Sequence, residues 1–497
     1  MGAKRKLKRR HRPAQAPRAR VSGPPEDLGP PLPICAVTAA VIISVPFFAR
    51  VWIEHGPRSI LETNVPVADL MIWLCVVATL IHMRVERRRQ QSDKPPSRRR
   101  PDRALASISI ELWVFVAAGG LSLMLSSRYL SGMPEFIQCV NYYILWFWVT
   151  AWASRYVRMQ HFLVASVVVI LFGGLLLAAW QIWCKTPTYL VRSMFRDHPT
   201  YVAAFVMLAP LAWCRLIVSP KAWPRALGYV IVGLGCACLG SAAAIVLVWA
   251  QTCLAARLIG DRWIRRASTV VGISLAGLLA VPSTYRDGLL AQPADWVRAP
   301  MAQRRAEVLL VKRAIAPPIP STHFGLGSWH CFLASNLPNG LRRFEPPTPL
   351  REKAQRVVVE YFAESWSALG LIARGPLLGS GLGSWQDRIG TGYGILERTG
   401  TSFPNTSNGY LMIGVTSGLV GLAAWLLALR RTLVRAYRRI RRGDLSPDRT
   451  LIAGCVAGLI GAAVVMLVCP FTTQPAAVYW VLLAALIHGM TLRRART

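Results

Sequence analysis

The sequence predicts an all-α polytopic membrane protein of about 12 transmembrane helices, with one long, partly helical extracytoplasmic loop. The first observation is composition: 53% of the 497 residues are hydrophobic, only 16% are charged, and the mean hydropathy is +0.38. A soluble chain of this length carries more charge. The second is that the apolar residues come in runs of about 17–23, long enough for a helix to cross about 30 Å of hydrocarbon. These runs lack the two-residue alternation of β-barrel strands.

The third observation is where the positive charge lies. The net charge is +35, from 58 Lys and Arg against 23 Asp and Glu, which could indicate a nucleic-acid-binding protein. The basic residues, however, lie mostly where apolar runs end, as expected for cytoplasmic segments that contact anionic lipids. We therefore expect membrane lipids and no nucleic acid as partners. The clusters are Lys4–Arg20, Arg84–Arg103, Arg430–Arg442 and Arg493–Arg496.

We predict about twelve spans from the apolar runs. The seventh and eighth are short and are separated only by Gly240 and Ser241, so they could form one longer span. Counting them separately keeps the dense basic clusters on one side, which favours about twelve spans with both termini in the cytoplasm. The segments are Pro33–Trp52, Pro66–Met83, Ser107–Ser126, Phe136–Ser154, His161–Trp183, Tyr201–Val218, Leu227–Leu239, Ala242–Leu258, Val270–Tyr285, Asn408–Leu429, Leu451–Pro470 and Pro475–Met490.

This topology places one long segment outside the membrane. Because structureless loops of such length are uncommon, we predict helices in it near residues 301–315 and 351–374, the second after a Pro-rich boundary. The expected parts of the chain are a basic, disordered cytoplasmic tail (residues 1–32), spans one to nine (33–285), the extracytoplasmic loop (286–407), spans ten to twelve (408–490) and a short basic cytoplasmic tail (491–497).

Cysteine usage indicates neither a metal site nor a disulfide framework. Most of the 11 cysteines fall inside apolar runs, where a thiol acts as a small hydrophobic side chain. No CxxC or Cys/His spacing typical of zinc occurs, so we expect no metal. Cys184 and Cys331 would both face outside, and a disulfide between them is left open.

The most informative stretch runs from Gly375 to Leu422. It begins with GPLLGSGLGSW, where Gly379, Gly381 and Gly383 permit positive φ and close approach of the backbone. Such a turn can present N–H groups to an anion, although a purely structural turn is commoner. The stretch continues with PNTSNGYLMIGVTSGLVGL, where polar residues precede an apolar helix. They could cap that helix or form a polar site at the mouth of the membrane.

A second polar stretch, VRSMFRDHPTY, precedes the sixth span. It places Arg192, Arg196 and His198 at an extracytoplasmic boundary, against the usual charge bias. Arginine there could bind a phosphate group. An ion pair with Asp197 is the simpler alternative, and both stay open.

Together these blocks resemble the O-antigen ligase and polymerase family of membrane glycosyltransferases. The family pattern is a PLLGxGLGxF-like turn, an HNxYL start of a span and GLxGL about two turns later. Here these read Pro376–Trp385, Ser407–Leu411 and Gly418–Leu422. A further family block, HPNYLAA, is similar to His198–Ala204. The order of the blocks, the external loop and the span layout also fit.

The resemblance implies a GT-C-like fold and a reaction outside the membrane. A glycan would pass from a polyprenyl-pyrophosphate carrier to an acceptor hydroxyl, with this lipid-linked donor and no further cofactor. Fixed guanidinium groups would stabilise the leaving pyrophosphate, while a base takes the acceptor proton. The implied residues are Arg192, Arg196, Arg356 and Arg374 for the donor pyrophosphate, Ser407, Asn408, His198 and Glu360 for catalysis, and Tyr410, Gly381 and Gly383 for the acceptor side.

Two positions depart from the family pattern. The family histidine is Ser407 here, and serine does not act as a base near neutral pH without help. The family arginine on the external helix falls near Tyr361 or Phe362, where Arg356 could substitute. The base is left open among His198, His323, His330, Glu360 and Glu364.

Other functions stay open at this stage. A polysaccharide polymerase of the same family would share these motifs. A transporter or flippase would also have many spans with cytoplasmic ends, although the sequence shows no repeat of two halves. An inactive scaffold of a glycan-assembly complex would explain Ser407. In each case the expected location is a bacterial plasma membrane.

Overall fold

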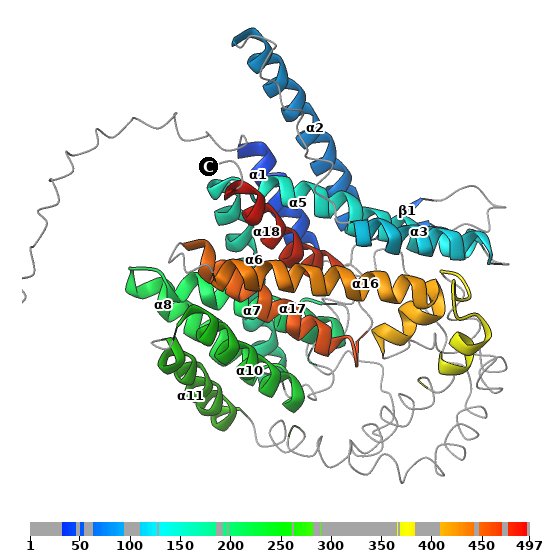
Figure 1. The fold of residues 1–497 in the computed structure, drawn as a ribbon. Coiled ribbons are helices and arrows are strands. Elements are labelled where there is room, and N and C mark those ends of the chain that lie inside the picture. The colour runs from blue at the N-terminus through cyan, green and yellow to red at the C-terminus, as the bar shows by residue number, and fades with distance from the viewer. Residues whose placement is uncertain are drawn as a thin grey trace, which may run out of the picture.

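The computed structural model describes residues 32–45, 50–53, 63–93, 110–126, 129–184, 191, 193–195, 198–260, 263–281, 289, 365, 368–382, 408–441, 447–469 and 476–494. These residues form a helical bundle with one small hairpin (Figure 1). Among the described residues, six helices are long and apolar enough to cross a membrane: Val67–Glu86, Val157–Trp183, Thr200–Ile217, Ala242–Ile259, Gly409–Arg441 and Asp448–Val465. Shorter apolar helices are Leu32–Ser44, Ile110–Met124 and Ala477–Thr491. The described residues therefore support a helical, multi-pass membrane protein.

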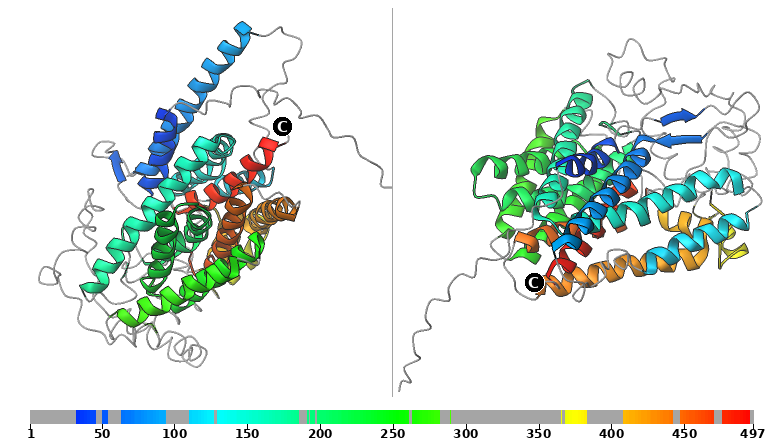
Figure 2. Two further views of the ribbon diagram at one scale, coloured as in Figure 1. Left: turned by 90° about the vertical axis from the view of Figure 1, so that its left-hand side faces the viewer. Right: turned by 90° about the horizontal axis from the view of Figure 1, so that it is seen from above.

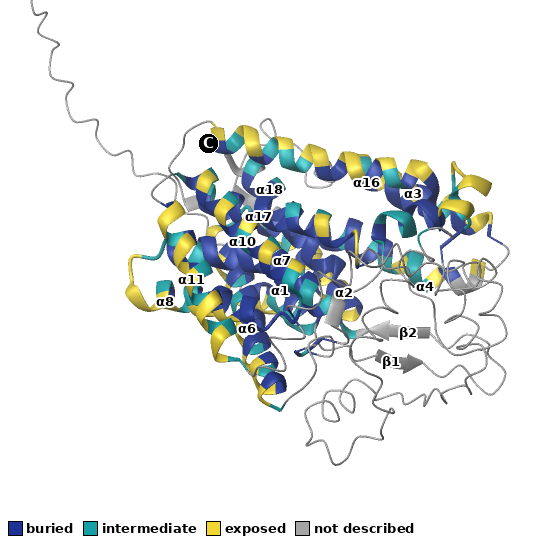
Figure 3. Cartoon of the chain, turned by 90° about the horizontal axis from the view of Figure 1, so that it is seen from below, coloured by how far each residue is buried: buried dark blue, intermediate teal, exposed yellow. Residues whose placement is uncertain are grey.

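The centre of the bundle is formed by α7 (His198–Ile217), α17 (Pro447–Val465) and α18 (Ala477–Arg494). Nearly all faces of these three helices are buried (Figure 3), as expected for apolar helices that have neighbours on every face. Glycines bring α17 against α7: a Cβ on Gly454 would stand 2.8 Å from the Leu211 Cα, and one on Gly458 would overlap the Met207 carbonyl. Small residues four apart permit such close approach of two membrane helices.

Helices α3 (Ile110–Met124) and α16 (Gly409–Arg441) lie side by side along one edge of the bundle (Figures 1 and 2). At one end Arg431 of α16 pairs with Glu111 of α3. At the other end Ser122 of α3 donates a hydrogen bond to the Thr416 carbonyl of α16 (2.5 Å). Since the two contacts occur in opposite order along the two helices, the helices are antiparallel.

Two of the predicted spans contain a π-helical turn. The fourth consists of α4 (Tyr129–Cys139), a π-helix at Val140–Trp146 and α5 (Phe147–Ala153). The seventh consists of α8 (Ala222–Tyr229), a π-helix at Val230–Leu234 and α9 (Gly235–Ala237). Apolar periodicity does not distinguish these turns from an α-helix, so the sequence did not predict them.

Further described helices are α1 (Leu32–Ser44), α2 (Val67–Asp93), α6 (Val157–Trp183), α10 (Ala242–Ile259) and α11 (Ile264–Ala280). Each predicted span thus contains a helix, but α2 and α16 continue past their predicted ends at Met83 and Leu429. Both continue through Arg-rich sequence, and α2 projects beyond the rest of the bundle (Figure 1). Arginine is a strong helix former and is favourable near a helix C-terminus.

The all-α prediction missed a small antiparallel hairpin. Strand β1 (Arg50–Ile53) pairs with β2 (Thr63–Pro66), with Arg50 opposite Pro66. The first span, predicted to reach Trp52, therefore ends at Ser44. The sequence contains Pro46 two residues after this end, and a proline disfavours helical backbone in the residue before it, here Val45.

The seventh and eighth predicted segments are separate helices. Gly240 has a φ of 65°, and the Ser241 hydroxyl accepts a hydrogen bond from the Ala244 amide (3.4 Å), which caps α10. Of the loop helices, residues 301–315 lie outside the described residues, while 368–374 of the second are helical. The number of membrane crossings and the cytoplasmic location of the termini stay predictions.

Candidate functional site

Helix α16 is broken inside the bundle at Gly418, where φ is 69° and ψ is −175°. In an unbroken helix the Leu419 and Val420 amides would donate to the Val415 and Thr416 carbonyls. The break separates these partners and leaves backbone polar groups in an apolar interior. Such groups must be paired again within the protein, because hydrocarbon offers no replacement.

These two carbonyls are paired from outside the helix. The Val415 carbonyl accepts hydrogen bonds from the Ser380 amide (2.7 Å) and the Ser380 hydroxyl (3.0 Å). The Thr416 carbonyl accepts one from the Ser122 hydroxyl of α3 (2.5 Å). The glycine-rich turn and α3 therefore cover the carbonyl side of the break.

The Leu419 and Val420 amides are paired by the glycine-rich turn. The Leu419 amide donates to the Pro376 carbonyl (2.8 Å), and the Val420 amide donates to the Leu377 carbonyl (3.3 Å). The turn thus donates to the first segment of α16 and accepts from the second. The break and the glycine-rich turn form one hydrogen-bonded unit.

Glycines are required in this unit. Gly379 (φ 73°) and Gly381 (φ 102°) have left-handed backbone, which favours glycine. A Cβ on Gly379 would overlap the Val415 carbonyl, and one on Gly381 would stand 2.5 Å from the Ser126 Cβ. The Gly379 and Ser380 amides donate to protein carbonyls, so these two N–H groups are not available to an anion.

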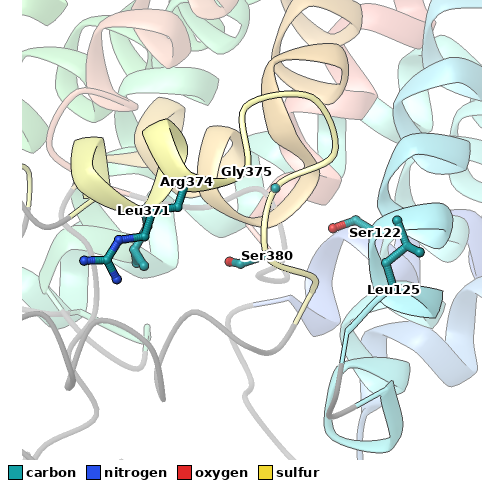
Figure 4. Close-up of a pocket in the computed structure, with 7 residues that line it drawn as sticks. Ser122, Leu125, Leu371, Arg374, Gly375 and Ser380 are labelled. Atoms are coloured by element: carbon teal, nitrogen blue, oxygen red, sulfur yellow. The ribbon is translucent and has the colours of Figure 1, made fainter.

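A cavity of about 440 Å³ lies beside the turn. Figure 4 shows Arg374 and Leu371 on one side, Ser122 and Leu125 on the other, and Ser380 between them. Gly375 and Gly379 complete the lining. The cavity therefore lies between α3, the turn and the short helix before it.

Among the described residues that line the cavity, Arg374 is the one with a positive charge. It ends helix 368–374, and its side chain is exposed. The Gly375 amide closes this helix by donating to the Leu371 and Ile372 carbonyls (3.3 and 3.2 Å). The helix packs on the first segment of α16, where Ala368 and Val415 are buried together. The predicted donor-binding Arg374 is thus held at the cavity by helix, turn and α16.

Asn408 and Tyr410, predicted for catalysis and for the acceptor side, are engaged in holding α16. The Asn408 side-chain oxygen accepts hydrogen bonds from the Tyr410 and Leu411 amides (3.0 and 3.1 Å), which is the geometry of a helix N-cap. The Tyr410 hydroxyl donates to the Ala463 carbonyl of α17 (2.5 Å). Neither side chain is among those that line the cavity.

Several predicted site residues lie outside the described part of the chain. His198 begins α7, with Pro199 in the first helical turn, but its side chain is among those not described. Around the cavity, the described lining contains hydroxyls and one guanidinium but no group that titrates as a base. The undescribed residues are Arg192, Arg196, Arg356, Glu360, Ser407 and Gly383, together with His323, His330, Cys331 and Glu364.

The sequence did not point to Ser122. This serine lies 294 residues before Thr416, its hydrogen-bond partner. The apolar run around it has no feature that distinguishes it from the other predicted spans. A second missed polar group contains Asp69, Asn141 and Tyr142, which are 3%, 1% and 0% exposed. Buried polar side chains in a membrane helix are costly, but none of these three lines the cavity.

Comparison with known proteins does not assign the chain to a family. No protein-family model matches the chain, and no curated protein matches it. The O-antigen ligase resemblance rests on the motif residues quoted above and stays a prediction. Among the described residues, no group of three or more His, Cys, Asp or Glu could hold a metal ion.

Proposed function

We propose that the protein is an O-antigen ligase-like glycosyltransferase that moves a glycan from a polyprenyl-pyrophosphate carrier to an acceptor hydroxyl. The observation that carries the proposal is the docking of the glycine-rich turn on the break in α16. The described part of one sequence block that resembles the family, Pro376–Leu382, is hydrogen-bonded there to another such block, Gly418–Leu422. A cavity with an arginine opens at the edge of this unit.

The chemistry of the cavity supports a phosphate-bearing donor. A guanidinium group can hold two phosphate oxygens at once and stays charged at every physiological pH. Placed at the leaving pyrophosphate, Arg374 would stabilise the negative charge that develops as the glycosidic bond breaks. A volume of about 440 Å³ falls within the usual range of ligand pockets, roughly 300–1,000 Å³. Arg192, Arg196 and Arg356 are the further donor-binding residues of this proposal.

The hydrogen-bonded unit would serve as the rigid support of the reaction. A site performs best when its functional side chains are mounted on elements that cannot shift. Arg374 lies one residue before a turn that is fixed at Gly375, Gly379 and Ser380 by backbone hydrogen bonds. The catalytic base is left open among Glu360, His198 and the other histidines and glutamate of the external segments.

Deletion of the gene in its native bacterium tests the proposal. The polyprenyl-pyrophosphate-linked glycan should accumulate, and one glycan-bearing envelope component should disappear, both followed by mass spectrometry. Complementation with Arg374→Ala should restore less than about a tenth of the product made with the wild-type gene. Arg438→Ala is the matched control, because it removes an exposed arginine from the basic end of α16, and it should restore the product fully. An unchanged pool of lipid-linked glycan in the deletion strain would overturn the proposal.

The break in α16 raises a second candidate function, that of a carrier or flippase for the lipid-linked glycan. Discontinuous helices often form the substrate sites of transporters, where opened backbone groups coordinate the cargo. Here the opened amides and carbonyls at Val415, Thr416, Leu419 and Val420 are all paired within the protein, which argues against that use. Protein in liposomes that moves labelled lipid-linked glycan across the bilayer without forming a glycosidic bond would favour the carrier.

A further inference from the structure

The segment between α6 and α7 is held by the side chain of Gln181, which lies near the end of α6. The Gln181 amide nitrogen donates to the Ser193 carbonyl (3.0 Å), and the Gln181 amide oxygen accepts from the Ser193 amide (2.9 Å). Both residues are buried. One side chain therefore pairs both backbone polar groups of Ser193, as a residue on a neighbouring antiparallel strand would.

The Ser193 side chain makes a third hydrogen bond to α6. Its hydroxyl donates to the Gly174 carbonyl (2.7 Å), and a Cβ on Gly174 would stand 3.3 Å from that hydroxyl. A Cβ on Gly173 would stand 3.0 Å from the end of the Met194 side chain. Two adjacent glycines thus leave room for the segment to lie directly on α6. We call the three hydrogen bonds between Ser193 and the residues Gln181 and Gly174 the Gln181 clamp.

The clamp holds Ser193 in a backbone conformation that its side chain disfavours. Its φ is 55°, and among the residues that the structure describes it is the one non-glycine residue with a positive φ. Such a conformation is costly for a residue with a Cβ, and it persists only where the surrounding structure enforces it. The three hydrogen bonds of the clamp provide that enforcement.

Buried apolar side chains hold the segment on both sides of Ser193. Val191 and Phe195 are buried, and the Phe195 ring lies 6.0 Å from the Tyr201 ring of α7, tilted by 33°. The described residues of the segment are therefore fixed to α6 by hydrogen bonds and to α7 by packing.

The clamp lies between two arginines of the chain. Arg192 directly precedes Ser193, and Arg196 directly follows Phe195. Both arginines are donor-binding residues of the proposed function. A guanidinium group holds two phosphate oxygens at once only in one relative orientation, so the affinity depends on how firmly the main chain beside the arginine is held.

We propose that Gln181 is a positioning residue for donor binding. By fixing the Ser193 backbone, it sets the place from which Arg192 and Arg196 reach the donor pyrophosphate. This role rests on the proposed function, because it needs these arginines to bind the donor. Gln181 itself would not touch the donor.

Binding of radiolabelled polyprenyl pyrophosphate to the purified full chain in detergent tests the proposal. Gln181→Met keeps the length of the side chain and removes both of its hydrogen bonds. It should weaken binding about tenfold, because arginines beside a loosened backbone must be ordered when the ligand binds.

Gln160→Met is the matched control. Gln160 lies near the other end of α6, is also buried, and donates from its amide nitrogen to the Ser154 carbonyl (2.6 Å). Its loss should lower the melting temperature, as Gln181→Met does, but should change the dissociation constant by less than about twofold. Equal losses of affinity in the two glutamine variants would overturn the proposal, since they would reflect a general loss of stability.

Gly174→Ala disturbs the clamp without removing Gln181. The added Cβ presses on the Ser193 hydroxyl, while alanine favours the helix, so the protein should fold. Binding should weaken about threefold, because the segment is displaced from α6. Unchanged binding in both Gly174→Ala and Gln181→Met would overturn the positioning role.

A double variant, Arg192→Ala with Arg196→Ala, separates this inference from the proposed function. Lost binding in the double variant, with normal binding in Gln181→Met, would overturn the positioning role alone. Normal binding in the double variant would overturn the assignment of these arginines to the donor, and the positioning role with it. Lost binding in both, with normal binding in Gln160→Met, would support the positioning role.

Discussion

The Leu377 carbonyl occupies the place where a Cβ on Gly418 would stand. This contact joins the glycine-rich turn to the break in α16, and it requires glycine both for its space and for its φ of 69°. Gly418→Ala should therefore lower the free energy of unfolding by more than about 2 kcal/mol, since strain and a backbone clash add up. The measurement is the melting temperature of the purified protein in detergent.

Gly272→Ala is the control for Gly418→Ala. Gly272 lies inside α11, and a Cβ there would meet nothing within 4 Å. Alanine is the better helix former by about 1 kcal/mol, so the melting temperature should hold or rise. A similar fall in both variants would show that the Leu377 contact has no special role.

Ser122→Ala should destabilise the protein more than Ser380→Ala. The Ser122 hydroxyl is the hydrogen-bond donor found for the Thr416 carbonyl, whereas the Val415 carbonyl keeps the Ser380 amide when the Ser380 hydroxyl is removed. An unpaired buried carbonyl costs about 1–3 kcal/mol, and a lost second bond costs about 1 kcal/mol or less. The reverse order of melting temperatures would contradict the assignment of Ser122 to the break.

Gly461→Ala should be harmful because of Gln251, and removing that side chain should relieve part of the harm. The Gln251 amide donates to the Val206 and Ala457 carbonyls (3.1 and 2.7 Å), which links α10 to α7 and α17. A Cβ on Gly461 would overlap the same amide nitrogen. Overpacking costs about 1–3 kcal/mol, while the loss of a hydrogen bond between membrane helices costs about 0.6 kcal/mol.

The test is a double-mutant cycle of Gly461→Ala and Gln251→Ala, followed by melting temperature. The double variant should be more stable than the sum of the single changes predicts, because the two residues compete for one space. Strict additivity would mean that Gly461 is needed only for its contact with Val206 (2.7 Å to the side chain).

Tyr410→Phe should affect stability and spare glycan transfer. Its hydroxyl donates to the Ala463 carbonyl, and its ring lies edge-on to Trp425 at 5.8 Å. Losing the hydroxyl should cost about 1 kcal/mol of stability, with the KM for the acceptor and kcat within about twofold of the wild type. A raised acceptor KM at an unchanged melting temperature would instead place Tyr410 on the acceptor side, as the family resemblance implies.

Local pattern predicted the helices well and their irregularities poorly. Each apolar run contains a helix, because burial of apolar side chains in lipid or in a bundle needs only composition and length. The hairpin at Arg50–Ile53 and Thr63–Pro66 was missed, since its strands have only four residues each and show no alternation of apolar and polar residues. The break at Gly418 was also missed, because a glycine in an apolar run is compatible with an intact membrane helix.

The candidate site, like the fold, could be predicted from the sequence only in part. Its two motif blocks and Arg374 could be identified along the chain, and the structure places them together. Asn408 was visible as a polar residue at a helix start, but its side chain caps α16. Ser122 could not be found in this way, because its hydrogen-bond partner lies on another helix.

The sequence by itself determined that the chain is a basic, helical membrane protein and that Gly375–Leu422 is its most distinctive stretch. These properties follow from composition, run length and short motifs, which act over a few residues at a time. Only the tertiary structure decided that the glycine-rich turn closes a broken helix and that α3 supplies the last hydrogen bond. Pairing of buried backbone groups depends on which segments meet in space. The order of residues along the chain does not show which distant segments these are.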